Sequence, residues 1–295
     1  MTHLVDWRPV RRGLTRRSLA EASLVLTAMD IENRVEHDAF DWRLVVHPEQ
    51  ASEAVRQLEQ YSLENRAADV HPMLVRSIDS GWPGVLGFIA IIWMIPALQS
   101  EQAFGWQWLV IGRNEAGAVA SGEWWRAITA LTLHGDIAHI LGNSVFGALF
   151  GLFVGRYLGS GLGWLLILLA GTVGNLLNAW LRPDEFRSIG ASTATFAALA
   201  IGGAFVYRRG YFKGRGLRRS LAPIFAGIAM LSFTGVGGEN TDVIAHFTGF
   251  AAGLGFGWLA AEFRLDEINQ QQQLWCGLAA LSIVAVAWLL AGASI

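Results

Sequence analysis

Seven long apolar stretches fill the chain from residue 82 onward, and they constrain the fold more than any other feature. A helix that crosses a bilayer needs about 20 mainly apolar residues. Because backbone polar groups inside a membrane must bond to one another, a helical bundle is favoured over an open sheet. We therefore expect membrane spans over residues 82–99, 134–156, 160–181, 190–207, 220–236, 242–262 and 274–293.

The composition also favours a membrane protein. The chain of 295 residues is 53% hydrophobic and 16% charged, whereas soluble globular proteins carry about 25% charged residues. A net charge of -2 gives no indication of nucleic acid as a partner. Arg11, Arg12, Arg16 and Arg17 precede no short apolar core, so we expect no signal peptide.

Charged residues are concentrated in residues 1–80, which hold half of them, and this segment predicts a small soluble domain of the order α-β-β-α. The sequence Ser18-Leu19-Ala20-Glu21 has the pattern of a capping box and predicts a helix over about 19–31. Two strands are expected at 33–37 and 42–46, and a second helix at about 49–65. Nothing in this segment indicates catalysis.

The distribution of basic residues predicts how the chain crosses the membrane. If residues 1–81 are cytoplasmic, the cytoplasmic loops hold eight Lys and Arg residues and the outer loops hold four. Basic residues are enriched in cytoplasmic loops, so we expect a cytoplasmic N-terminus and an outer C-terminus. The connection over residues 100–133 contains four tryptophans, which favours a position in the outer leaflet.

Polar residues inside the expected spans are candidates for function, because ionisable groups are costly in a membrane. The spans 134–156, 190–207 and 242–262 all run inward from the outer face in this orientation. Their first turns hold His134, His139, Ser192 and His246. These side chains are therefore expected at a similar depth near the outer surface.

Such a set could perform nucleophilic catalysis. A serine is a weak nucleophile until a base removes its proton, and a histidine is suited to this at neutral pH. Asn143 follows His139 by four residues, so both share one helix face and Asn143 could donate to an oxyanion. His134 would lie at the mouth of the site.

Small residues would allow the two helices that carry Ser192 and His246 to approach each other closely. The later helix has them at Ala245, Gly249 and Gly253, and the earlier helix has Ala194 and Ala198.

Other interpretations of these residues stay open at this point. A membrane serine often bonds to a carbonyl of its own helix, and Asn143 could serve only helix packing. A metal site from His134, His139 and His246 would have only Asp136 nearby, at a spacing unlike known metal patterns. We expect no metal and no cofactor. A transporter would have charged residues at mid-bilayer and inverted repeats, which the sequence lacks.

At these residues the chain resembles the rhomboid family of intramembrane serine proteases. The resemblance covers about residues 82–262 and consists of four motifs in the family's order. They are Gly122-Glu123-Trp124-Trp125-Arg126, the pattern His134, His139 and Asn143, the triplet Gly190-Ala191-Ser192, and Ala245-His246 with Gly249 and Gly253.

The resemblance implies a six-helix core over 82–262, followed over 263–295 by a linker and a seventh helix. Ser192 would attack, His246 would act as base and then acid, and no acidic third member is implied. His139 and Asn143 would bind the oxyanion with the Ser192 amide, with Gly190 in support. The implied activity is cleavage of transmembrane protein substrates near the outer face of a lipid bilayer, expected in the inner membrane of a bacterium.

One residue departs from the family's pattern. The nucleophile motif is usually Gly-x-Ser-Gly, and Thr193 takes the last position here. Because threonine is bulkier than glycine, two functions remain: an active protease, or an inactive rhomboid-like module that binds or routes client helices.

Overall fold

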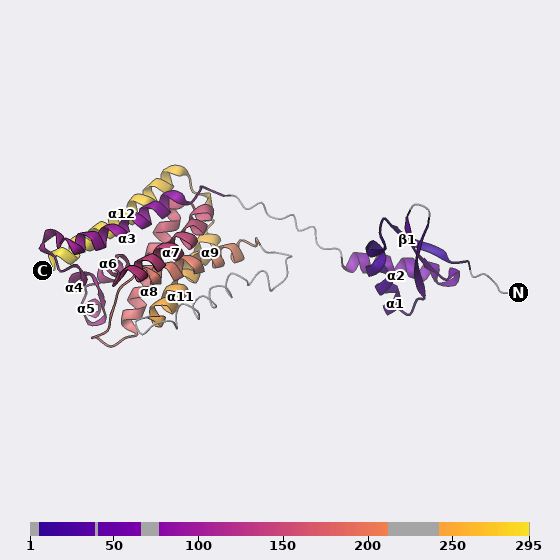
Figure 1. The fold of residues 1–295 in the computed structure, drawn as a ribbon, viewed down its shortest axis with the longest axis horizontal. Helices are drawn as coiled ribbons and strands as arrows, with labels where there is room; N and C mark the ends of the chain where they lie inside the picture. The colour runs from indigo at the N-terminus through magenta and orange to yellow at the C-terminus, as the bar shows by residue number, and fades with distance from the viewer. Residues whose placement is uncertain (1–5, 39–40, 66–76, 212–241, 295) are drawn as a thin grey trace. The chain divides into compact units, whose positions relative to one another are not determined.

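The computed structural model describes residues 6–38, 41–65, 77–211 and 242–294 (Figure 1). The chain divides into two compact units, residues 1–71 and residues 72–295. They are called the N-terminal unit and the membrane unit below, and each is described by itself.

The N-terminal unit is a three-stranded antiparallel sheet with the strand order β1-β3-β2, covered by two helices. Its hydrophobic core contains Leu19, Leu26, Leu44, Val46 and Leu58, which come from the helical segments and from the central strand. The elements are β1 (Arg8–Gly13), η1 (Arg16–Leu19), α1 (Ala20–Ala28), β2 (Asn33–His37), β3 (Trp42–Val46), η2 (Pro48–Gln50) and α2 (Ala51–Glu64).

Two features of this unit correct the sequence analysis. The predicted order α-β-β-α lacks β1, an edge strand with a register shift between Pro9 and Arg11 and without the apolar alternation that predicts strands. The prediction of a capping box formed by Ser18 and Glu21 was wrong. The Thr15 side chain instead accepts from the Ser18 amide and caps η1, so α1 begins only at Ala20. The strands at 33–37 and 42–46 are confirmed.

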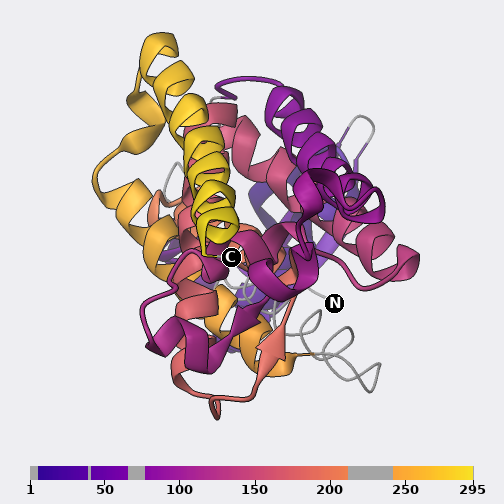
Figure 2. The same ribbon diagram turned by 90° about the vertical axis from the view of Figure 1, so that its left-hand side faces the viewer.

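The membrane unit is a helical bundle, which confirms the fold class of an all-α polytopic membrane protein (Figure 2). Its long helices are α3 (Trp82–Ser100), α7 (Ile137–Leu158), α8 (Ser160–Trp180), α9 (Ser192–Arg208), α11 (Val243–Glu262) and α12 (Gln270–Ala293). Within the described part of the chain, five of these, all except α9, are long and apolar enough to cross a membrane. The expected span 220–236 lies outside the described residues.

Helix boundaries differ from the expected spans where a cap or a glycine sets the first turn. Helix α7 begins at Ile137, three residues later than expected, because the Asp136 side chain caps it. Helix α9 begins at Ser192, two residues after Gly190 with its positive φ. Helix α12 begins four residues early, because Asn269 and Gln272 form a capping box before the apolar stretch.

Helix α9 packs against α7, α8 and α11, and its contact with α11 is very close. A Cβ added at Gly249, Gly253 or Gly257 would lie 2.3 to 2.4 Å from the carbonyl oxygens of Thr193, Ala197 and Ile201, respectively. Because the contacting residues of both helices increase in number in the same direction along the contact, α9 and α11 run parallel. Gly249 and Gly253 of α11 form the close contact as predicted. On α9 they approach Thr193 and Ala197, each one residue before the predicted Ala194 and Ala198.

The connection between α3 and α7 folds into short elements. They are η3 (Ala103–Gly105), α4 (Trp108–Gly112), β4 (Asn114–Glu115), α5 (Ala116–Ala120), α6 (Arg126–Thr129) and η4 (Ala130–Thr132). Strand β4 pairs antiparallel with β5 (Arg187–Ser188). The Trp108 ring contacts the rings of Trp106 and Trp288, so this connection packs onto α12. Its expected position in the outer leaflet stays a prediction.

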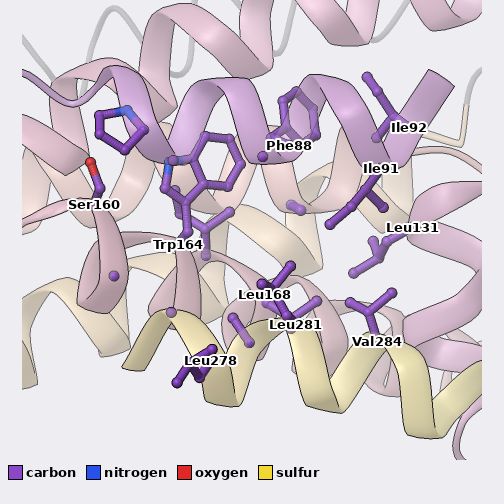
Figure 3. A pocket seen from close by; sticks show the side chains of 18 of the residues that line it. Phe88, Ile91, Ile92, Leu131, Ser160, Trp164, Leu168, Leu278, Leu281 and Val284 are labelled. Atoms are coloured by element: carbon purple, nitrogen blue, oxygen red, sulfur yellow. The ribbon is translucent and has the colours of Figure 1, made fainter. Parts of the chain in front are cut away.

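An apolar cavity of about 430 Å³ lies between α3, α8 and α12. Phe88 and Trp164 line it together with Leu278 and Leu281 of α12 (Figure 3). It extends to Ala191, but Ser192 and His246 are not among its lining residues.

Candidate active site

Gly190 organises the start of α9. Its φ of +124° is a conformation that side chains rarely adopt, and its amide donates to the Ala130 carbonyl at 2.9 Å. A Cβ at this position would lie 2.5 Å from His139 Nε2. Glycine is therefore required both by the backbone and by the close approach of His139. Ser192, two residues later, is half-buried in the first turn of α9.

His139 and Asn143 lie one turn apart on α7, on the same face as predicted. The His139 amide donates to Asp136 Oδ1 at 2.8 Å, which fixes the first turn of the helix. Asn143 is buried, and its Nδ2 has no hydrogen-bond partner among the described residues. This Nδ2 lies 3.7 Å from the Cβ position at Gly190. The structure thus brings both side chains together beside the segment that precedes Ser192.

His246 lies in the second turn of α11 and is only 6% exposed. Its ring stacks on Phe196 with a centroid distance of 4.4 Å and an interplanar angle of 28°. Phe196 follows Ser192 by one turn of α9, so His246 faces the part of α9 that carries the serine. In the described part of the chain, no hydrogen bond joins Ser192 to His246, and the catalytic dyad stays a prediction.

His134 precedes α7 and is not part of the helix. Its ring makes an edge-to-face contact with His139 at a centroid distance of 5.1 Å, and it is buried in the protein. The described residues include no group of three or more His, Cys, Asp or Glu side chains that could hold a metal ion. Asp136, which precedes His139 by three residues, caps α7.

Asp242 connects the helix of His246 to α8, a role that the sequence analysis missed. Its side chain accepts from the Ala245 amide at 3.1 Å and caps α11. It also accepts from Asn178 Nδ2 at 2.6 Å and forms an ion pair with Arg182 at 3.0 Å. An aspartate directly before an apolar helix is a recognisable cap, but the pairing with Arg182 has no local sequence signal.

Thr193 lies at the contact of three helices and is only 2% exposed. Its Cγ2 lies 2.7 Å from the Cβ position at Gly174 of α8 and 2.8 Å from that at Gly249 of α11. The methyl group is therefore accommodated by two glycines on neighbouring helices.

A small cavity lies directly beside the serine. Its volume is about 10 Å³, close to the room that one water molecule needs. Gly190, Ser192, Thr193, Asp242 and Ala245 are among its lining residues. The candidate nucleophile thus faces a small, partly polar space.

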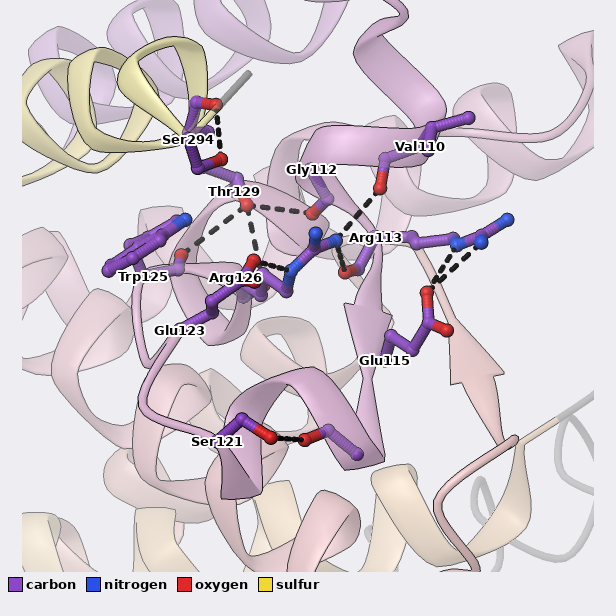
Figure 4. A network of polar contacts seen from close by, with 12 residues as sticks. Val110, Gly112, Arg113, Glu115, Ser121, Glu123, Trp125, Arg126, Thr129 and Ser294 are labelled. Atoms are coloured by element: carbon purple, nitrogen blue, oxygen red, sulfur yellow. Dashed lines mark hydrogen bonds and ion pairs between the residues drawn. The ribbon is translucent and has the colours of Figure 1, made fainter.

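A polar network holds the connection that precedes α7 (Figure 4). Arg126 is 8% exposed, and its guanidinium donates to Glu123 at 2.6 Å and to the carbonyls of Val110 and Arg113 at 2.8 and 3.2 Å. Thr129 donates to the Gly112 carbonyl at 2.7 Å. The buried charge is thus satisfied, and it ties residues 122–126, called the Trp-Arg motif below, to the preceding α4 segment.

The pairing of β4 with β5 links the same connection to the segment that leads to Ser192. Glu115 pairs with Arg113 at 3.0 Å and with Arg187 at 3.2 Å. Burial raises the pKa of Glu115, but the hydrogen bonds from Arg187 and Arg113 outweigh it and hold this pKa below its usual value. The ion pair of Glu115 with Arg187 spans 72 positions of sequence and could not be predicted from it.

Comparisons with known proteins agree with this geometry. The family model described as the rhomboid domain matches residues 121–263. The chain is 28% identical over 178 residues to YdcA of Bacillus subtilis, provisionally named a rhomboid protease, covering 60% of this chain and 87% of the relative.

Two further relatives match shorter segments. Rhomboid protease GluP of Bacillus subtilis is 37% identical over 99 residues, which cover 34% of this chain and 18% of GluP. Rhomboid-like protease 3 of Toxoplasma gondii is 30% identical over 146 residues, covering 50% and 55% of the two chains. The matched domain includes the Trp-Arg motif, His139, Asn143, Ser192 and His246. The chain belongs to the rhomboid family of membrane proteins.

Proposed function

We propose that this protein is an intramembrane serine endopeptidase that cleaves transmembrane protein substrates. The observation that carries the proposal is the convergence at the start of α9. His139 and Asn143 of α7 approach Gly190, and Ser192 follows Gly190 by two residues. The His246 ring of α11 stacks on Phe196, which lies one turn after Ser192 on α9. Relatives named as proteases support the general activity.

The proposed reaction is acyl transfer through Ser192. His246 removes the proton from Ser192 Oγ as this oxygen attacks the scissile carbonyl carbon. The resulting oxyanion accepts hydrogen bonds from the Ser192 amide, Asn143 Nδ2 and His139. His246 then gives its proton to the leaving amine, and the peptide bond breaks. Water, deprotonated by His246, attacks the acyl-enzyme, and the proton returns to Ser192 as the acid product leaves.

We place the cleavage site near the outer membrane face, with the N-terminus cytoplasmic and the C-terminus outside. The excess of basic residues in the expected cytoplasmic loops supports this orientation, and we expect the inner membrane of a bacterium. A scissile carbonyl must leave its helical hydrogen bond before Ser192 can attack it. Substrate segments that unwind easily are therefore expected to be preferred.

The alternative, an inactive module that binds client helices, has Thr193 as its only support. The contact of the Thr193 methyl group with Gly174 and Gly249 favours the protease, because the added bulk is directed at the helix interface.

The proposal is tested with the purified full-length protein and a transmembrane substrate in liposomes. We expect Ser192→Ala and His246→Ala to abolish cleavage. Ser144→Ala is the matched control, since Ser144 donates to the Ile140 carbonyl of its own helix at 2.7 Å, and it should cleave like the wild type. Cleavage by Ser192→Ala at the wild-type rate would refute the assignment.

A fluorophosphonate probe separates the two candidate functions without a known substrate. An active serine nucleophile should be labelled in the wild type and in Ser144→Ala, and labelling should be absent in Ser192→Ala. A folded wild-type protein that takes up no probe would favour the inactive module.

A further inference from the structure

The first strand and turn of the N-terminal unit carry a dense positive charge. Residues 8–17 contain five arginines and no acidic residue, and all five arginines are exposed. We call residues 8–17 the basic turn; its arginines are Arg8, Arg11, Arg12, Arg16 and Arg17.

These charges differ from the other described arginines of the unit in having few partners. Within the described residues, only Arg12 of the basic turn forms an ion pair, with Asp41 at 3.6 Å. By contrast, every described arginine of this unit outside the basic turn pairs with an acidic side chain: Arg34 with Glu32, Arg43 with Asp38 and Asp41, and Arg56 with Glu53. The basic turn therefore offers charge that the fold does not neutralise.

An apolar side chain projects from the middle of this charge. Leu14 is 90% exposed, the highest value among the exposed large hydrophobic side chains of the described chain. Thr15 accepts from the Ser18 amide at 3.2 Å, and Ser18 donates to the Thr15 carbonyl at 2.6 Å. These bonds fix the turn directly after Leu14, so its exposed position is set by ordered backbone.

We propose that the basic turn binds the surface of a bilayer that contains anionic lipids, with Leu14 inserted among the headgroups. Arginines are attracted to the negative potential of such a surface. An apolar side chain between basic residues adds hydrophobic attraction at the interface. The five arginines would contact the headgroup phosphates while the rest of the unit stays in water.

The membrane unit keeps the N-terminal unit close to a bilayer, because both belong to one chain. Asn65 at the end of α2 and Trp82 at the start of α3 are 17 positions apart, which limits their separation to about 60 Å in a fully extended chain. A covalent connection of this length keeps the basic turn at a high effective concentration near the membrane. The inference does not depend on the proposed protease activity.

The test uses the full-length protein in nanodiscs and measures amide hydrogen exchange of residues 8–19. One set of discs contains only phosphatidylcholine, and the other contains about one third phosphatidylglycerol. We expect slower exchange of these residues in the anionic discs, and this protection should decrease as salt is raised, because salt screens exposed charge. Exchange in β2 and α2, measured in the same samples, reports whether the unit stays folded.

Two variants with the same change in net charge make the test specific. Arg16→Gln/Arg17→Gln removes two charges from the basic turn, and we expect at least a roughly tenfold lower ratio of bound to unbound unit. Arg56→Glu changes the net charge equally but lies on α2, paired with Glu53, and should bind as the wild type. Leu14→Ser should weaken binding without changing its salt dependence.

Equal exchange of residues 8–19 in both kinds of disc would overturn the proposal. So would an equal loss of protection in Arg16→Gln/Arg17→Gln and Arg56→Glu, since net charge alone would then explain the effect. Protection that appeared only with an added acidic protein or nucleic acid would assign the basic turn to that partner instead.

Discussion

Gly174 lies on α8 with neighbours from two other helices in the space where a side chain would be. A Cβ there would meet the Cα of Gly249 and the Cγ2 of Thr193, each at 2.7 Å. The backbone of α11 cannot move away without disturbing His246 three residues earlier. The bulk of Thr193 and the absence of a side chain at residue 174 are therefore linked.

We predict that Gly174→Ala destabilises the membrane unit by about 1–3 kcal/mol, as overpacking of a core does, and lowers probe labelling of Ser192. Stability is measured by thermal unfolding in detergent. Gly142→Ala on α7 is the control, because its Cβ would have no neighbour within 4 Å. It should not destabilise the unit, and the better helix propensity of alanine should stabilise it by at most about 1 kcal/mol. Equal effects of both variants would contradict the packing argument.

Sequence motifs were sufficient to propose Ser192, His246, His139 and Asn143, because each motif is local. The residues that surround Thr193 could not be predicted in the same way. Gly174 is 19 positions before it and Gly249 is 56 positions after it, and a glycine alone does not indicate which side chain it accommodates. The sequence therefore identified the departure from the family pattern but not its structural consequence.

At the scale of secondary structure, two strands of two residues each connect the loop region to the nucleophile. Asn114 pairs with Ser188 and Glu115 with Arg187, and the Ala116 amide donates to the Phe186 carbonyl at 3.0 Å. Ser188 lies two residues before Gly190. The ion pairs of Glu115 with Arg113 and Arg187 thus hold the segment that leads into α9.

The lowered pKa of Glu115 predicts a specific pH dependence of this pairing. The ionised carboxylate is favoured in the folded state, so its contribution is complete above the ordinary pKa of 4.5. The contribution is lost as the pH falls through the lower pKa of the folded protein. We expect faster amide exchange of Ala116 in Glu115→Gln than in the wild type at neutral pH. The difference should shrink below pH 4.5; a constant difference over this range would contradict the assignment.

Element boundaries show where prediction from sequence reaches its limit. The long apolar helices were found because their length alone is diagnostic. The strands β1, β4 and β5 were missed because they are short or rich in arginine, and their partners lie far along the chain. The start of α7 was placed three residues early because hydropathy does not register the cap provided by Asp136.

At the scale of the whole molecule, the two units have separate hydrophobic cores. Every residue of the first core lies at or before Tyr61, and the clusters of the membrane unit all lie at or after Phe88. The candidate site belongs entirely to the second unit, and the basic turn belongs to the first. Folding of the site is therefore not expected to require the N-terminal unit.

We predict that a chain beginning at residue 72 folds and keeps the reactive serine. Its thermal unfolding in detergent should match that of the membrane unit in the full chain, and fluorophosphonate labelling should stay within about twofold, because no core contact is removed. Ser192→Ala in the shortened chain is the control for specific labelling. Loss of labelling from a folded shortened chain would show that the N-terminal unit acts on the site directly. Retained labelling would leave the N-terminal unit with a separate role, and the exposed arginines around Leu14 point to the membrane surface.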